Sequence, residues 1–332
     1  MREGEEEPGE PTGGTGPRLV VGYTYSDTGA RPLAANTVFY ASPMIEVSTA
    51  DPQTGVIPVD VPAGVSVIVQ NLSNGPALGT TATFWFARPS FGALVDITRI
   101  GTATATSIPP GGADLLTCTT EWTPSADFGT HQCLLVQAEC LNDTLPTTPP
   151  GLAFRPDLAR HVGQRNLTIT AHGQPMLLTV SNPFDHENLA VLRHRGWRLT
   201  GVTPELCETL GIHPADLATH ALEPRVQRML RRYEVGLSHE VESRIELSDT
   251  GNEGRADTID PDTADLLTQR PGEPTGEPFA EFALPDATFR EVELTISSAD
   301  LGPDDLEVHE FVQTVGNIEV GGYITVGIAG PR

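Results

Sequence analysis

The sequence contains no lysine, so arginine supplies all 20 of its basic residues, against 44 acidic residues. The resulting net charge of −24 repels the phosphate backbone of nucleic acids, and we expect no nucleic-acid partner. Aromatic residues make up only 6% of the chain. No apolar run reaches the roughly 18 residues that a membrane-spanning helix needs. The composition therefore argues against nucleic-acid binders and against proteins with membrane-spanning helices.

The start of the sequence lacks the apolar core of a signal peptide. Met1 and Arg2 are followed by a stretch rich in glutamate and glycine. From this we expect either a cytoplasmic protein or part of a particle that leaves the cell without the general secretory route.

Cysteine is scarce, and no C-x-x-C pair occurs, which excludes a zinc ribbon and a thioredoxin motif. Cys118, Cys133 and Cys140 lie close together in strand-like sequence, and Cys207 lies apart. One pair of the first three is a candidate disulfide. The favoured alternative is that the thiols are buried and act as small apolar residues.

The common catalytic motifs are also missing. His239-Glu240 and His309-Glu310 each begin like H-E-x-x-H, but neither has the second histidine. No P-loop, no G-x-S-x-G elbow and no G-x-G-x-x-G after a strand is present. We therefore predict that the protein is not an enzyme.

What is present is a series of short strands separated by turns. The chain of 332 residues is long enough for about two domains. Strand-like segments with turn residues every 10–15 positions favour β-sandwiches. The sequence predicts an all-β protein with these parts: a disordered acidic tail (1–17), an immunoglobulin-like sandwich (18–146), a Pro/Thr linker (147–151), and a second such sandwich (152–330) with a helical and loop insertion at about 195–278.

Helix signals occur only inside the predicted insertion. Thr203, Pro204 and Gly211 predict the cap, first residue and end of a short helix. Residues 214–234 carry apolar side chains at near-helical spacing, and Pro224 should divide this helix or restart it.

Several segments resemble bacterial immunoglobulin-like domains of the CARDB type. The resemblance is carried by VSVIVQNLSNGPALGTTATFWFARP, IPPGGADLLTCTTEWTP and HQCLLVQAE in the first half, and by QRNLTIT, LLTVSNPF and FVQTVGNIEVGGYITVGI in the second. It implies a sandwich fold and an adhesive, spacer or assembly role. The family brings no catalytic residues to transfer, and a fold does not decide a function.

The predicted insertion concentrates positive charge. Arg225, Arg228, Arg231 and Arg232 fall close to one face of a helix. Arginine binds carboxylates with two parallel hydrogen bonds, so this face is a candidate docking surface for an acidic partner. The alternative is the solvated side of an amphipathic helix.

An acidic segment follows and is expected to form a loop. It offers hard oxygen ligands for Ca²⁺, from Asp249, Asn252, Asp257, Asp260, Asp262 and Asp265. It lacks the fixed spacing of a calcium hand, so a solvated loop is the alternative.

Together these features favour a non-enzymatic structural or interaction module of a larger assembly, such as a surface appendage, a phage-like particle or an injection machine. We expect a protein partner or self-assembly. The alternative is a carbohydrate- or ligand-binding module with Ca²⁺ in the Asp-rich segment. The three tryptophans are expected to lie in the core.

Overall fold

The computed structural model describes residues 16–48, 57–58, 60–88, 90–92, 94–125, 133–145, 154–171, 175–239, 241, 243–298 and 301–328. The linker predicted at 147–151 and nearly all of the predicted acidic tail lie outside these residues. Strands dominate the described part and form several mainly antiparallel sheets, which confirms the all-β class. The sheets pack face to face in β-sandwich-like pairs, whereas the immunoglobulin-like arrangement itself stays a prediction.

The first half of the chain forms two sheets, here called sheets I and II. In sheet I, β3 (Val65–Asn71) pairs with β1 (Leu19–Val20), β2 (Ile45–Val47) and β6 (Ala113–Thr117). Sheet II has the order β5-β4-β7-β8, with bounds Val95–Ile108, Ala77–Arg88, Cys133–Glu139 and Val162–Arg165. Alternate residues of β3 are buried against sheet II because the side chains of a strand point to opposite faces.

The second half forms sheets III and IV. Sheet III has the order β10-β15-β13, with bounds Met176–Asn182, Thr288–Ser298 and Ser243–Arg255. Sheet IV has the order β12-β11-β16-β17-β9, with bounds Gly236–Ser238, Asn188–Thr200, Leu306–Val315, Ile318–Ile328 and Leu167–Ala171. β14 (Glu277–Leu284) pairs with β11 as well, and β9 runs parallel to β17.

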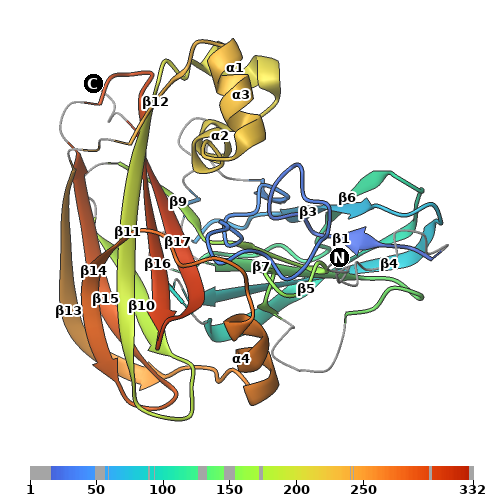
Figure 1. Ribbon diagram of the computed structural model, residues 1–332. Helices are drawn as coiled ribbons and strands as arrows, with labels where there is room; N and C mark the ends of the chain where they lie inside the picture. The colour runs from blue at the N-terminus through green and yellow to red at the C-terminus, as the bar shows by residue number, and fades with distance from the viewer. Residues whose placement is uncertain are drawn as a thin grey trace, which may run out of the picture.

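Three helices cover the outer face of sheet IV. They are α1 (Pro204–Leu210), α2 (Pro214–Thr219) and α3 (Pro224–Arg232). Thr203 caps α1 and Gly211 ends it in the left-handed region, both as predicted. Pro224 begins α3 after a break, also as predicted. A fourth helix, α4 (Pro261–Thr268), lies at the opposite end of the molecule from α1–α3 (Figure 1).

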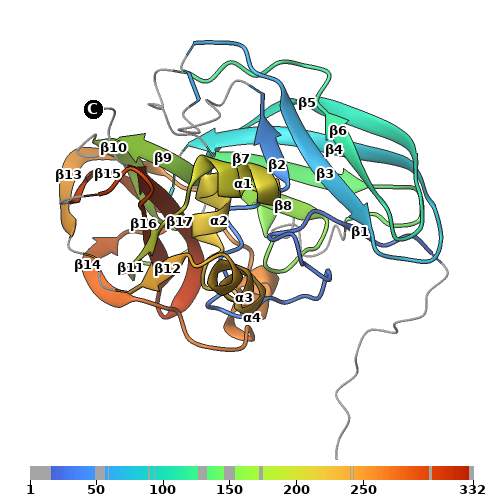
Figure 2. The same ribbon diagram turned by 90° about the horizontal axis from the view of Figure 1, so that it is seen from above.

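The strand β16 is buried along its whole length, all ten residues of it. One of its faces packs in the core between sheets III and IV, and the other packs under the helices. The core under the helices also contains Phe39 and Tyr40 from the first half of the chain. The two halves therefore share buried side chains, and Figures 1 and 2 show them side by side from two directions.

Two predicted boundaries need correction. β8 follows the predicted linker but pairs with β7, so sheet II extends past the predicted end of the first sandwich to Arg165. The predicted insertion at 195–278 is also too broad. β11 runs on to Thr200, and residues 243–255 form β13 rather than a loop, because they pair along β15.

The described cysteines and tryptophans test two expectations about the core. All four cysteines are buried and form no disulfide, as expected for thiols that act as small apolar residues. Trp122 and Trp197 are buried, but Trp85 is only partly buried and lines a cavity. In the part of the chain that the structure describes, no helix is long and apolar enough to cross a membrane.

Candidate functional site

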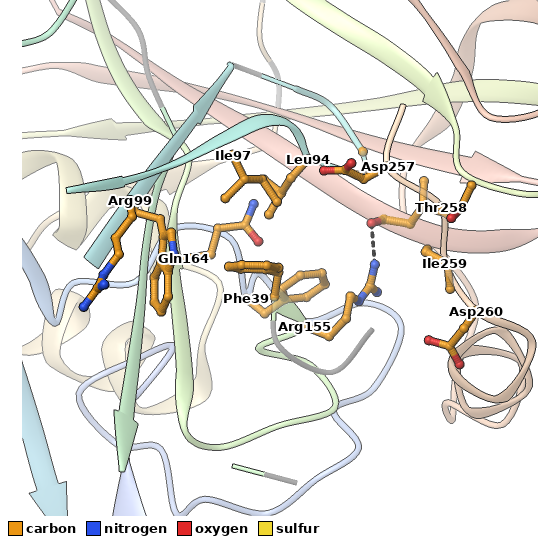
Figure 3. Close-up of a pocket in the computed structure, with 14 residues that line it drawn as sticks. Phe39, Leu94, Ile97, Arg99, Arg155, Gln164, Asp257, Thr258, Ile259 and Asp260 are labelled. Atoms are coloured by element: carbon orange, nitrogen blue, oxygen red, sulfur yellow. Dashed lines mark hydrogen bonds between the residues drawn. The ribbon is translucent and has the colours of Figure 1, made fainter. Parts of the chain in front are cut away.

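A cavity of about 740 Å³ lies between the two halves of the molecule (Figure 3). Its apolar walls come from seven side chains: Phe39, Trp85, Leu94, Ile97, Phe154, Ile259 and Val320. The rings of Trp85 and Phe154 meet edge to face, with centroids 5.6 Å apart. Polar groups are contributed by Arg99, Arg155, Gln164, Asp257, Thr258 and Asp260. Cavities of this size, mostly apolar with a few polar groups and placed between domains, are typical of ligand sites.

A buried ionic network lies beside this cavity. Arg155 donates to both carboxylate oxygens of Asp157, at 2.9 and 2.6 Å, and to the backbone oxygen of Val320 at 2.7 Å. Nη1 of Arg270 lies 3.0 Å from Oδ2 of Asp157, and its Nη2 lies 3.4 Å from Oε1 of Glu319. Because Arg155 and Asp157 lie between β7 and β8 of the first half while Arg270 and Glu319 belong to the second half, the network ties the two halves together.

The two carboxyl groups of this network differ in pKa. Burial alone would raise the pKa of Asp157, but the charges of Arg155 and Arg270 outweigh it and lower that pKa. Burial raises the pKa of Glu319 to about 8, helped by the nearby charges of Asp157 and Glu310, and Arg270 only partly offsets this. Glu319 Oε2 also has no hydrogen-bond partner among the described residues. Asp157 is therefore ionised at neutral pH, and Glu319 is largely protonated.

A second contact between the halves centres on Glu310 of β16. The Tyr40 hydroxyl donates to Glu310 Oε1 at 2.5 Å, and Arg195 of β11 donates to Glu310 Oε2. Burial and the Glu310 charge raise the pKa of Tyr40 well above its ordinary value. The Tyr40 ring lies so close to Gly322 that a Cβ there would sit 2.2 Å from its Cζ.

The carboxylate of Asp257, an exposed residue, lines the cavity. In Figure 3 it points toward Leu94. No ion pair or hydrogen bond of this side chain is found among the described residues. Partial burial and the neighbouring charge of Asp96 raise its pKa. Asp260 lies on the same side, but its side chain caps α4 by accepting from Thr263 N at 3.0 Å.

The four arginines predicted as a docking surface are all exposed on α3: Arg225, Arg228, Arg231 and Arg232. Within the described part of the chain, none of their side chains forms an ion pair or hydrogen bond. The opposite side of α3 packs Leu230 into the core beneath the helices. Three other arginines of the second half, on β11, do have partners. Arg195 and Arg198 pair with Glu310 and Glu307 of β16, and Arg193 donates to the Gly276 backbone oxygen at 3.3 Å.

An apolar groove of about 400 Å³ lies next to this basic face. It runs between α1, α2, α3 and the segment at Tyr25, whose side chain is 46% exposed. Its apolar lining comes from Tyr25, Leu210, Ile212, Leu217, Val226 and Met229. Arg225 also lines it, so the groove and the basic face form one surface, here called the helical surface.

The residues predicted to bind Ca²⁺ are divided between two elements. Asp249 and Asn252 lie on β13, where Asp249 pairs with Arg290 at 3.2 Å and the Asn252 amide donates to Glu291 at 2.9 Å. Asp260 and Asp262 lie at the start of α4, and Asp257 lies before them at the cavity. Among the described residues, no group of three His, Cys, Asp or Glu side chains is arranged to hold a metal. The calcium site stays a prediction.

A chain of hydrogen bonds joins β11 and β16 inside the second sandwich. Arg198 and Ser243 both donate to Glu307, which also lies 2.9 Å from His309 Nε2. His309 Nδ1 lies 3.1 Å from His194 Nε2. Burial, followed by the neighbouring His309, lowers the pKa of His194 to about 4. The chain satisfies polar groups inside the sandwich and opens onto none of the cavities described above.

Sequence reasoning missed the cavity because its residues come from positions as distant as Phe39 and Val320. The charged residues Arg155, Asp157 and Arg160 are grouped just after the proline-rich segment, but their spacing matches no motif that would have marked them as part of a site. The helical surface was found because its arginines lie on one short helix.

Comparisons with known proteins give little guidance. No family model matches the sequence, and a search of curated proteins finds no match. Among solved structures, a red sea bream transglutaminase is similar with a TM-score of 0.19 and 11% identity, over 87% of this chain and 31% of that chain. The CupB6 tip adhesin from Pseudomonas aeruginosa gives a TM-score of 0.21 and 6% identity, over 96% of this chain and 98% of that chain. These scores are too low to support an argument about function, so the proposals below depend on the geometry of the molecule itself.

Proposed function

We propose that this protein is a non-enzymatic interaction module that docks an acidic segment of a partner protein on its helical surface. The observation that carries the proposal is the set of four exposed α3 arginines that have no ionic partner among the described residues. Exposed basic residues on a chain of net charge −24 have many acidic groups within the same molecule to pair with. Leaving four of them open along one helix favours a contact with a second molecule.

The groove beside α3 defines the partner's chemistry further. Its aliphatic and aromatic lining suits one or two large apolar side chains, and the arginines suit carboxylates on either side of them. The proposed occupant is therefore an acidic segment that also presents apolar residues. The charged contacts would speed and orient the encounter, and the groove would supply the buried apolar area.

The test measures binding of a short fluorescent peptide rich in glutamate, with two leucines one helical turn apart. We expect its anisotropy to rise with wild-type protein, and not when lysine replaces glutamate in the peptide. The double variant Arg228→Gln/Arg231→Gln should weaken binding about thirtyfold, because each of the two charge-assisted contacts contributes of the order of 1 kcal/mol. The matched control Arg244→Gln/Arg255→Gln removes the same charge from β13.

Equal binding by the two double variants, or no preference for the acidic peptide, would overturn the proposal. Light scattering then identifies the source of the segment. A mass that is a multiple of 35.4 kDa and that falls to one copy in Arg228→Gln/Arg231→Gln indicates a second copy of this chain. A single-copy mass in wild-type protein, together with peptide binding, indicates a different protein.

A further inference from the structure

We propose that the cavity between the two halves binds a small organic cation, an ammonium group carried on an apolar body. This site is separate from the helical surface and from the partner proposed for it. The inference starts from the shape and lining of the cavity, whose volume of about 740 Å³ suits a small molecule.

The apolar body of the ligand has a wall to pack against. Trp85 is only partly buried and is held edge-on by Phe154 at 5.6 Å. Leu94 and Ile97 line the same cavity. The indole face attracts cations through its quadrupole, and more strongly when water is excluded. Phe39 is already engaged, because the guanidinium groups of Arg155 and Arg270 lie 5.6 and 5.3 Å from its ring centre.

The charged groups at the cavity favour a cation over an anion. Arg155 is committed to Asp157 and to the Val320 backbone, so its charge is already balanced. Asp257 is also exposed, but its carboxylate points toward Leu94 of the cavity lining and has no ionic partner among the described residues. Partial desolvation, followed by the nearby charge of Asp96, raises the pKa of Asp257, and a bound cation would oppose both effects.

One basic residue at the cavity has to be accounted for. Arg99 is exposed, and in Figure 3 its guanidinium lies on the side opposite Asp257 and is directed away from the centre. The net charge of −24 also raises the local concentration of cations around the molecule and lowers that of anions.

The experiment titrates three probes of similar size into the full chain: benzyltrimethylammonium, benzyl alcohol and phenylacetate. Tryptophan fluorescence reports binding, since Trp122 and Trp197 are buried away from the cavity while Trp85 lines it. Calorimetry checks the affinities independently. We expect the cation to bind about tenfold more tightly than the alcohol, and phenylacetate to bind most weakly.

Two variants test whether the carboxylate of Asp257 binds the cation. Asp257→Asn should weaken binding of the cation about tenfold and leave binding of the alcohol unchanged. Asp114→Asn removes the same charge from the exposed strand β6 and should change neither. Equal affinity for cation and alcohol, tighter binding of phenylacetate, or an unchanged affinity in Asp257→Asn would each overturn the inference. The α3 variants leave this cavity intact, so failure here is distinguishable from failure of the proposed docking function.

Discussion

At the scale of single residues, Glu319 is a carboxyl group with too few partners for its charge. Arg270 Nη2 lies 3.4 Å from Glu319 Oε1, whereas Arg270 Nη1 lies 3.0 Å from Asp157 Oδ2. The positive charge of Arg270 is therefore shared between two carboxyl groups and is closer to Asp157. Asp157 and Glu310 add negative charge nearby, and Arg155 adds positive charge. The folded protein thus keeps a proton on Glu319 at a pH where the unfolded chain has lost it.

This proton makes stability depend on pH in a defined direction. Because the pKa of Glu319 rises from 4.5 to about 8 on folding, the free energy of unfolding falls as pH rises between those values. The expected loss from pH 6 to pH 8 is about 2 kcal/mol. Glu319→Gln, which copies the protonated group, should flatten this slope in urea titrations. His194, whose pKa falls from 6.5 to about 4 on folding, contributes a slope of the opposite sign below about pH 6.5, which wild-type protein and Glu319→Gln share.

An equal slope in wild-type protein and Glu319→Gln would contradict this expectation. The exposed control Glu246→Gln should keep the wild-type slope.

Gly322 lies at a position where the neighbouring ring of Tyr40 leaves no room for a side chain. An added Cβ would lie 2.2 Å from Tyr40 Cζ, and Tyr40 is held in place by full burial and by its hydrogen bond to Glu310. We expect Gly322→Ala to lower the free energy of unfolding by about 1–3 kcal/mol through overpacking. Gly16→Ala, where nothing lies within 4 Å, is the control and should change stability little. Equal stability of the two variants would mean that the Tyr40 ring moves aside without cost.

At the scale of elements, α1 depends on Thr203, the N-cap residue that precedes it. The Thr203 hydroxyl accepts a hydrogen bond from Leu206 N at 3.2 Å, which satisfies one of the unpaired amides of the first turn. Thr203→Ala should cost about 1 kcal/mol of stability in thermal or urea unfolding. Thr209→Ala, on the exposed side of the same helix, should cost less than about 0.5 kcal/mol. If both substitutions cost the same, the cap does not stabilise α1.

The sequence predicts an element when a local pattern of residues marks it. β3 has one buried face, so Val65, Val67 and Val69 alternate with half-buried residues and the strand was predicted. Among the described strands β13 pairs only with β15, and most of its residues from Ser248 onward are exposed. Because no apolar pattern marks this part of the strand, the sequence predicts a loop there. Local caps such as Thr203 and Gly211 were predicted because their chemistry acts over a few residues.

The cavity could not be predicted in this way. Its lining residues are brought together by contacts between the two halves, and each of them alone looks like ordinary core or surface. Trp85 is the clearest case, since its position in a strand predicted burial. The helical surface needed only the spacing of arginines on α3, but the groove beside it also needed Tyr25 from the other end of the chain.

At the scale of the whole molecule, the shared buried contacts predict a single unfolding transition. Tyr40 and Glu310, like Asp157 and Arg270, come from different halves and are buried together. Neither half can unfold without exposing an unpaired charge or polar group of the other, which is costly. Differential scanning calorimetry should give one peak with equal calorimetric and van't Hoff enthalpies. Two separate peaks would mean that the halves are independent units.

The parallel pairing of β9 with β17 has a consequence for synthesis on the ribosome. Thr168 pairs with Thr325, so β9 emerges long before the strand that completes its edge of the sheet. At typical elongation rates this interval lasts roughly 10–30 s. During that time Phe39 and Tyr40 also lack the β16 and β17 residues that later cover them. The nascent chain therefore carries an unpaired strand and exposed aromatic side chains until its last segment arrives, which is the interval in which a chaperone would have most effect on the yield of folded protein.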